Sequence, residues 1–134
     1  MAKRMVKGVL YNPYKDDEPR VITMEEDFRV LRDAIDCRCF DITTRKFGNV
    51  ICDIVCDDEG LMVEQPRAVV HNDDGTFIAG AVFITGEADD DGYLTSLTTE
   101  QCNTILNMFK RRDIITPDSI YPSWSIYGKY YWED

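Results

Sequence analysis

The segment TFIAGAVFIT, residues Thr76–Thr85, is the clearest strand of the chain. Turn-forming residues bound it on both sides, at 71–75 and 87–92. Gly80 interrupts it, and we expect a bulge or a close approach of another backbone there. Its apolar residues are of the β-branched and aromatic types that strands favour, namely Phe77, Ile78, Val82, Phe83 and Ile84. The segment therefore predicts a sheet at the centre of the fold.

Further strands are predicted on the N-terminal side of this segment. Met5–Tyr11 has the apolar content of a strand. Cys37–Thr44 and Asn49–Cys56 are predicted to form a hairpin joined through residues 45–48. Leu61–Val63 and Ala68–His71 are shorter strand candidates.

Two amphipathic helices are predicted. Thr23 and Glu26 form a capping box, and apolar residues at helical spacing continue the helix from Met24 to Asp36. Thr98 and Gln101 form a second capping box, which opens a helix from Thr99 to Arg112. The order of elements indicates an α+β fold, with two helices packed on a mostly antiparallel sheet.

The C-terminal segment Trp124–Trp132 has the alternation of a strand, with aromatic side chains on both faces. One interpretation is a terminal aromatic strand packed on the sheet. The other is an exposed aromatic patch that binds a partner.

Composition and charge limit the class of protein. A chain of 134 residues has room for one domain, and its net charge is −10. That charge argues against direct binding of nucleic acid or of anionic membranes. The five cysteines are an odd number, and no apolar run is long enough to span a membrane. With no signal peptide in the sequence, we expect reduced thiols and a cytoplasmic location.

A metal site was weighed against structural roles for the cysteines. Zinc would need ligands from Cys37, Cys39, Cys52, Cys56 and His71, the only histidine. Alternation argues against zinc because it buries Cys52 and Cys56 and turns Cys37 and Cys39 to the opposite face. The expected buried face of the hairpin joins Phe40 and Ile42 with Val50, Cys52 and Ile54.

A calcium loop is the second metal hypothesis. Residues Glu87, Asp89, Asp91 and Gly92 resemble the first half of such a loop, but its last ligand position holds Thr98 instead of a glutamate. We therefore expect no metal and no cofactor.

The sequence contains no recognisable catalytic motif. Any nucleophile–histidine pair would have to use His71, which lies beside a turn. The glycines do not form a phosphate-binding loop. We therefore expect a protein that is not an enzyme.

Short acidic runs at turns are the most conspicuous surface feature. Asp57, Asp58 and Glu59 form one run, and Asp89, Asp90 and Asp91 form another. They are either solvated loops or a surface of carboxylates that imitates nucleic-acid phosphates and occupies a basic cleft.

The middle of the chain resembles domain-of-unknown-function family 3846. The similarity extends from about Val6 to Lys110. Its motifs are Ile51, Asp57-Asp58-Glu59-Gly60, Pro66-Arg67-Ala68, Ile78-Ala79-Gly80, Phe83-Ile84 followed by Gly86, and Ser96-Leu97-Thr98 followed by Glu100-Gln101. The chain departs from the family pattern where Asp36-Cys37 replace paired glycines and where Asp58 replaces an asparagine.

The resemblance implies an accessory protein of a phage, plasmid or other mobile element, acting in a host cytoplasm. It implies no activity and supplies no catalytic residues. On this basis residues 1–112 form the family-like domain, and residues 113–134 form an aromatic extension packed on it.

The leading functional hypothesis is an acidic binding protein that engages and inhibits a host protein, such as a basic nucleic-acid-binding one. Its contact residues would be the two acidic runs with Tyr127, Tyr131 and Trp132. The alternative is a small-molecule, nucleotide-like binder with Arg67 and His71 in its pocket, although Arg67 could instead form a structural ion pair with a turn carboxylate. A homodimer, paired through the tail strand, is a third hypothesis.

Overall fold

The computed structural model describes residues 3–132 and has the α+β fold that the sequence predicts. A five-stranded antiparallel sheet has the order β2-β1-β7-β4-β3. Its strands are β1 (Met5–Tyr11), β2 (Arg20–Glu25), β3 (Phe40–Phe47), β4 (Val50–Asp57) and β7 (Val82–Gly86). A four-stranded sheet has the order β6-β5-β11-β8. Its strands are β5 (Ala68–His71), β6 (Phe77–Ala79), β8 (Lys110–Arg111) and β11 (Trp124–Tyr127).

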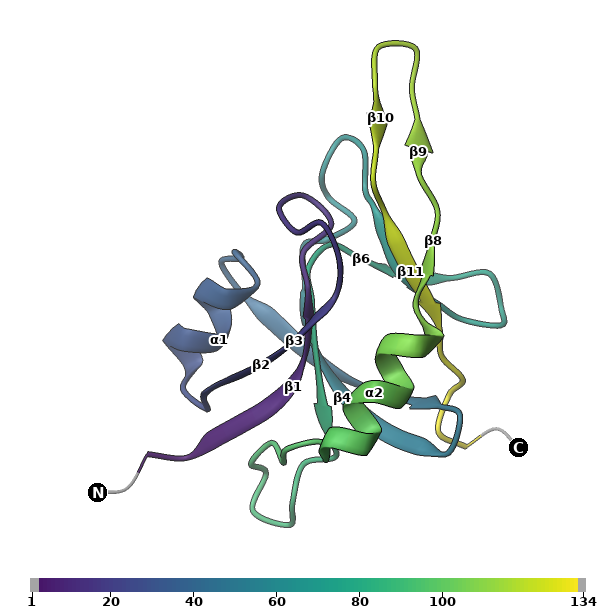
Figure 1. Ribbon diagram of the computed structural model, residues 1–134. Helices are drawn as coiled ribbons and strands as arrows, with labels where there is room; N and C mark the ends of the chain where they lie inside the picture. The colour runs from purple at the N-terminus through teal and green to yellow at the C-terminus, as the bar shows by residue number, and fades with distance from the viewer. Residues whose placement is uncertain (1–2, 133–134) are drawn as a thin grey trace.

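Both faces of the five-stranded sheet are covered (Figure 1). The helix α1 (Phe28–Ala34) packs on one face, and α2 (Thr99–Met108) packs with the small sheet on the other. Strand β7 shows the alternation this requires: Phe83 belongs to the α1 core, whereas Val82 and Ile84 belong to the α2 core. An apolar run such as that of β7 is therefore explained by burial on both faces.

The strand expected over Thr76–Thr85 is in fact two strands in two sheets. Gly80 lies between β6 and β7 with φ +90°, a conformation that residues with a Cβ rarely adopt. The chain changes direction there and passes from the small sheet into the large one. The expected bulge at Gly80 is therefore wrong, whereas the alternative, a close approach of another backbone, is confirmed: the Gly60 Cα lies 3.8 Å from a Cβ built at Gly80.

The prediction of the second helix start is confirmed, and that of the first is wrong. Thr98 and Gln101 form a complete capping box at α2, which ends at Met108 instead of Arg112 because Lys110 and Arg111 pair with β11. At α1 the expected cap Thr23 lies inside β2. Asp27 caps this helix instead, accepting hydrogen bonds from the amides of Arg29 and Val30.

The predicted hairpin exists with a different register. Strands β3 and β4 are joined by a two-residue turn, and Gly48 takes the positive φ of +60° that such a turn needs at its first position. Phe40 pairs with Asp57 and Ile42 pairs with Val55, so both share a face with Val55 and not with Cys52 and Ile54. The turn consists of residues 48 and 49 instead of 45–48, and directly paired residues lie on the same face, so this pairing decides which side chains Phe40 and Ile42 meet.

The C-terminal segment is part of the core. Strand β11 ends at Tyr127, not at Trp132, and it is paired on both sides, with β5 and with β8. Ile126 is fully buried, and the amide of Trp124 donates a hydrogen bond to the Tyr11 hydroxyl (3.0 Å). The strand is therefore not a free edge.

Before β11, the hairpin of β9 (Ile114–Ile115) and β10 (Ile120–Tyr121) projects from the body of the protein (Figure 1). The predicted strand Leu61–Val63 is instead an exposed turn region. No helix within residues 3–132 is long and apolar enough to cross a membrane.

Candidate functional site

The two acidic runs lie at opposite ends of the paired strands β4 and β7. Cys56, just before the first run, pairs with Val82 at the start of β7. Cys52 pairs with Gly86, just before the second run. The expected contact surface therefore cannot use both runs as one continuous patch.

The first run forms a tightly packed turn. The amide of Glu59 donates to the Asp57 carboxylate (2.9 Å), and the amide of Gly60 donates to the Asp57 carbonyl (3.1 Å). Arg38 donates two hydrogen bonds to Glu59 (3.0 and 2.6 Å), and these bonds hold the pKa of Glu59 below its ordinary value. Gly60 is required because a Cβ would overlap the carbonyl oxygen of Ala79.

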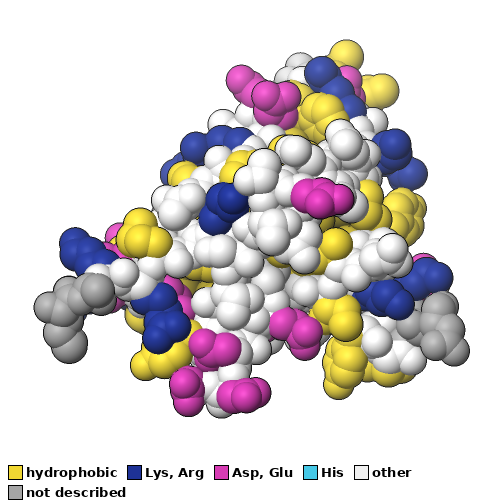
Figure 2. All heavy atoms as spheres, turned by 60° about the horizontal axis from the view of Figure 1, so that its bottom comes forward, with side chains coloured by type: hydrophobic (Ala, Val, Ile, Leu, Met, Phe, Trp, Pro, Cys, Tyr) yellow, Lys and Arg dark blue, Asp and Glu magenta, His cyan; other side chains and the backbone are white. Residues whose placement is uncertain are grey.

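The second run is an exposed loop that closes on itself. The Asp89 carboxylate accepts hydrogen bonds from the amides of Asp91 and Tyr93 (both 3.0 Å). Arg4 lies 3.7 Å from the same carboxylate and packs over the Tyr93 ring. Figure 2 shows acidic side chains projecting from the loop that comes forward at its lower edge.

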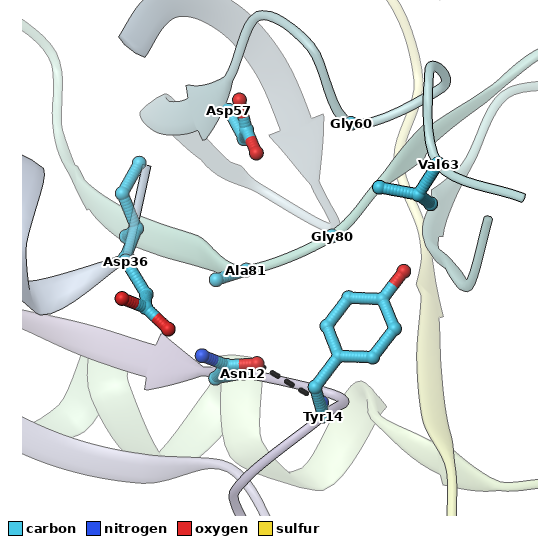
Figure 3. Close-up of a pocket in the computed structure, with 9 residues that line it drawn as sticks. Asn12, Tyr14, Asp36, Asp57, Gly60, Val63, Gly80 and Ala81 are labelled. Carbon is cyan, nitrogen blue, oxygen red and sulfur yellow. Dashed lines mark hydrogen bonds between the residues drawn. The ribbon is translucent and has the colours of Figure 1, made fainter. Parts of the chain in front are cut away.

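A cavity of about 290 Å³ lies beside the first turn. Figure 3 shows that Asp57 from the end of β4 and Asp36 from the end of α1 both project toward it, with Asn12 and Tyr14 on the opposite side. Apolar side chains complete the lining, namely Ile35, Val63 and Ala81, and Gly60 and Gly80 contribute backbone. Two of the three glycines in the family-like motifs, Gly60 and Gly80, thus meet at one hollow.

Asn12 is the most deeply buried polar residue of the cavity, with 5% of its surface exposed. Its side-chain oxygen accepts a hydrogen bond from the amide of Tyr14 (2.9 Å). Its side-chain nitrogen has no hydrogen-bond partner among residues 3–132 and lies on the cavity side, toward Asp36 (Figure 3). A donor is therefore available to a ligand at this point.

Asp36 occupies an unusual backbone position at the end of α1. Its φ is +55°, in the left-handed region that favours glycine. A glycine, which the family pattern has at this position, adopts this conformation easily. The aspartate adopts it only at a cost in conformational energy. Lys15 forms an ion pair with the Asp36 carboxylate at 2.8 Å, at the exposed rim.

Arg67 lies next to the cavity and is held without an ion pair. Its guanidinium donates to the carbonyl of Pro13 (2.7 Å) and packs between the rings of Tyr14 and Tyr121, 4.8 and 4.6 Å from their centroids. Within residues 3–132 it forms no ion pair, so the expected pairing with a turn carboxylate is wrong. We define the Arg67 surface as the exposed segment Leu61–Val63 together with Tyr14, Arg67 and Tyr121; of that segment, Val63 lines a hollow with Tyr14 and Arg67.

His71 has different neighbours from Arg67. Its ring stacks on Tyr127 (5.2 Å between centroids) and lies near Phe77. Burial lowers the pKa of His71, and the charge of Arg112 lowers it further. The two residues proposed for a small-molecule pocket are therefore not brought together.

The C-terminal aromatic residues form a separate group. Trp132 stacks on Tyr130 and contacts the edge of Tyr131, and Tyr130 donates a hydrogen bond to Asp74 (2.9 Å). Across the described part of the chain, no hydrogen bond, ion pair or ring contact joins Tyr127, Tyr131 or Trp132 to either acidic run.

The cysteines are all free thiols. Burial raises the pKa of Cys52 and of Cys56 to about 12, and that of Cys37 to about 11, which keeps these thiols protonated. Cys52 and Cys56 are buried as expected, and Cys39 is exposed. The alternation argument for separating them is wrong, because Asp41 pairs with Cys56 and because Cys37 and Cys39 both precede β3. Within residues 3–132 no three His, Cys, Asp or Glu side chains are arranged to hold a metal ion.

Sequence reasoning selected Asp57 and Arg67 but missed the other side of the cavity. Asn12 and Tyr14 were not predicted as site residues, and Asp36 was expected at the end of a helix. The signal that could have indicated them is the Asn12-Pro13-Tyr14 turn directly after a buried strand.

The chain matches no curated protein and no solved structure. One family model, described as Domain of unknown function (DUF3846), matches residues 6–110, the range over which the sequence motifs resemble that family. Because this match covers most of the chain, the protein belongs to the DUF3846 family.

Proposed function

We propose that the protein is a non-enzymatic binding protein of a mobile genetic element and that it engages a protein of the host cell. Its contact region is the Arg67 surface together with the neighbouring cavity. This replaces the contact made by both acidic runs and the C-terminal aromatics, which lie in separate places.

The observation that carries the proposal is the composition of the Arg67 surface. Met62 is 77% exposed and Leu61 is 61% exposed, and they directly precede Val63, which lines a hollow with Arg67 and Tyr14. The guanidinium of Arg67 is held between two tyrosine rings. Tyrosine, arginine and methionine are enriched at the centres of protein interfaces. A guanidinium already fixed by stacking loses little freedom on binding, which favours affinity.

Affinity capture from host cytosol, with elution by increasing salt, tests this proposal. The double variant Leu61→Ser/Met62→Ser is compared with Tyr131→Ser/Trp132→Ser, which also removes two exposed apolar side chains. We expect the first variant to lose a partner that the second retains. Retention by the first and loss by the second would place the contact at the C-terminal aromatics instead.

Nucleic-acid mimicry against a host defence system is a second candidate function, and it would use the other end of the molecule. Two acidic residues from different segments lie near Arg4 there: the Asp89 carboxylate is 3.7 Å from its guanidinium, and the charges of Arg4 and Asp89 both act on the Glu26 carboxyl. Desolvation raises the pKa of Glu26, and the charge of Asp89 raises it further. A mimic would release its partner at moderate salt, whereas a contact through the Arg67 surface would resist salt.

A further inference from the structure

We propose that the cavity beside the first turn receives one basic side chain, lysine or arginine, from the partner protein. This inference rests on the proposed function and specifies the chemistry of the partner. The cavity would bind the basic side chain, and the Arg67 surface would contact the partner around it.

The Asp57 carboxylate supplies the acceptor for the cation. One of its oxygens accepts the amide of Glu59, and the carboxylate makes no ion pair within the described residues. An ionised carboxylate can accept several hydrogen bonds, so it retains capacity for a ligand. Asp36 adds a second carboxylate, whose charge Lys15 offsets at the rim. The cavity therefore favours a cation and disfavours a phosphate.

Asn12 supplies a hydrogen-bond donor on the wall of the cavity. Its side-chain nitrogen faces the cavity and has no protein partner among residues 3–132, although only 5% of the residue is exposed. The nitrogen itself is open to the cavity, so a ligand can replace water as its acceptor. A carbonyl oxygen of the entering peptide segment would accept this hydrogen bond. A basic residue offers both the cation and that carbonyl.

The apolar lining suits the remainder of such a side chain. Ile35 and Ala81 are buried, and Tyr14 and Val63 stand at the mouth. Lysine and arginine bury their aliphatic stems against apolar surface of this kind. A volume of about 290 Å³ lies at the lower end of the range for ligand pockets, which fits one long side chain.

NMR titration of the isotope-labelled protein with Nα-acetyl-lysine methylamide and Nα-acetyl-arginine methylamide tests the inference without any partner. Nα-acetyl-norleucine methylamide has the same kind of stem without the charge and is the control probe. We expect saturable shifts of the Asn12 side-chain amide and of the Gly60, Gly80 and Ala81 backbone amides with the basic probes only. Equal shifts with norleucine, or no shifts in these groups, would overturn the inference.

Three variants sharpen the result. Asp57→Asn should weaken binding of the basic probes about tenfold, because a hydrogen bond to a charged group is lost. Asp90→Asn makes the same change in the other acidic loop and should have no effect. If Asp57→Asn does not fold, Val63→Trp blocks the mouth from an exposed position and should abolish the shifts.

The outcomes separate this inference from the proposed function. If the basic probes fail while the Leu61→Ser/Met62→Ser variant still loses its partner, the cavity is not the anchor and the Arg67 surface remains the contact. If the probes bind but the partner is retained by that variant, the proposed contact region is wrong.

Discussion

The turn at 57–60 and the loop at 89–92 look alike in the sequence, since each is an acidic run that ends in glycine. In the structure both form turns in which the first aspartate accepts the amide two residues on, but their surroundings differ. Gly60 is buried against the backbone of Ala79, whereas nothing lies within 4 Å of a Cβ built at Gly92. The first turn borders a cavity, and the second projects into solvent and is closed by Asp89.

The difference teaches that an acidic run acquires its role from what packs beneath it. The first turn lies where the chain crosses between the two sheets at Gly80, so its backbone must fit against another backbone. The second run lies in the loop that connects β7 to the segment before α2. The Asp89 carboxylate accepts hydrogen bonds from backbone amides of that same loop. Charge alone did not separate a candidate binding site from a solvated loop.

Alanine substitution of the two glycines should give the largest contrast. We expect Gly60→Ala to reduce the free energy of unfolding by about 3 kcal/mol, because the added Cβ overlaps the Ala79 carbonyl. Gly92→Ala should cost about 1 kcal/mol, because only the positive φ of +86° is strained. Urea denaturation measures both, and equal losses would contradict the contrast.

Each acidic segment also has a neighbouring arginine that packs on tyrosine. The two arginines should differ in how much they stabilise the fold. Arg67→Ala removes a hydrogen bond and two ring contacts and should cost about 2 kcal/mol. Arg4→Ala removes one ring contact and one exposed ion pair and should cost less than about 1 kcal/mol. Thermal unfolding of the two variants measures both losses of stability. A larger loss for Arg4→Ala than for Arg67→Ala would contradict the prediction.

Asp89→Ala should open its loop with little effect on the whole protein. The carboxylate accepts two amides within the loop, so hydrogen exchange of the Asp91 and Tyr93 amides should accelerate. The free energy of global unfolding should change by about 1 kcal/mol or less. A larger global loss would mean that the loop supports the core.

Acidification should produce the smallest difference in stability between the two segments. Of the two, only the first turn should respond. The folded-state pKa of Glu59 lies below its ordinary value of 4.5, so the unfolded chain takes up this proton first as the pH falls. The contribution of the Arg38 contact is therefore present above pH 4.5 and is lost below it. We expect Glu59→Gln to be slightly destabilised at neutral pH and to match the wild type in acid. Unfolding curves of Asp90→Asn, measured in parallel, provide the matched control.

Local signals in the sequence predicted much of the fold. Strand β1 has the bounds that the apolar pattern indicates, and the capping box at Thr98 forms as its spacing requires. The first helix start was missed because Thr23 and Glu26 also have a capping pattern, and pairing of β2 with β1 prevailed over it. The hairpin register was missed because the turn consists of two residues, 48 and 49, instead of the four residues 45–48.

The candidate site was only half visible in the sequence. Asp57 and Arg67 were selected from the acidic run and the family-like motif. The cavity, however, is formed by segments far apart along the chain, and Asn12 and Asp36 reach it only through tertiary packing. Similarly, the pairing of Arg67 with Tyr121 joins the family domain to the C-terminal hairpin, which no local pattern could indicate.

Site-specific photo-crosslinking tests the central claim most directly. A photoreactive amino acid replaces either Met62, on the Arg67 surface, or Asp90, in the solvent-exposed acidic loop, and both proteins are irradiated in host cells. We predict a covalent partner complex from position 62 and none from position 90. A complex from position 90 alone would contradict the account and would place the contact at the acidic loop.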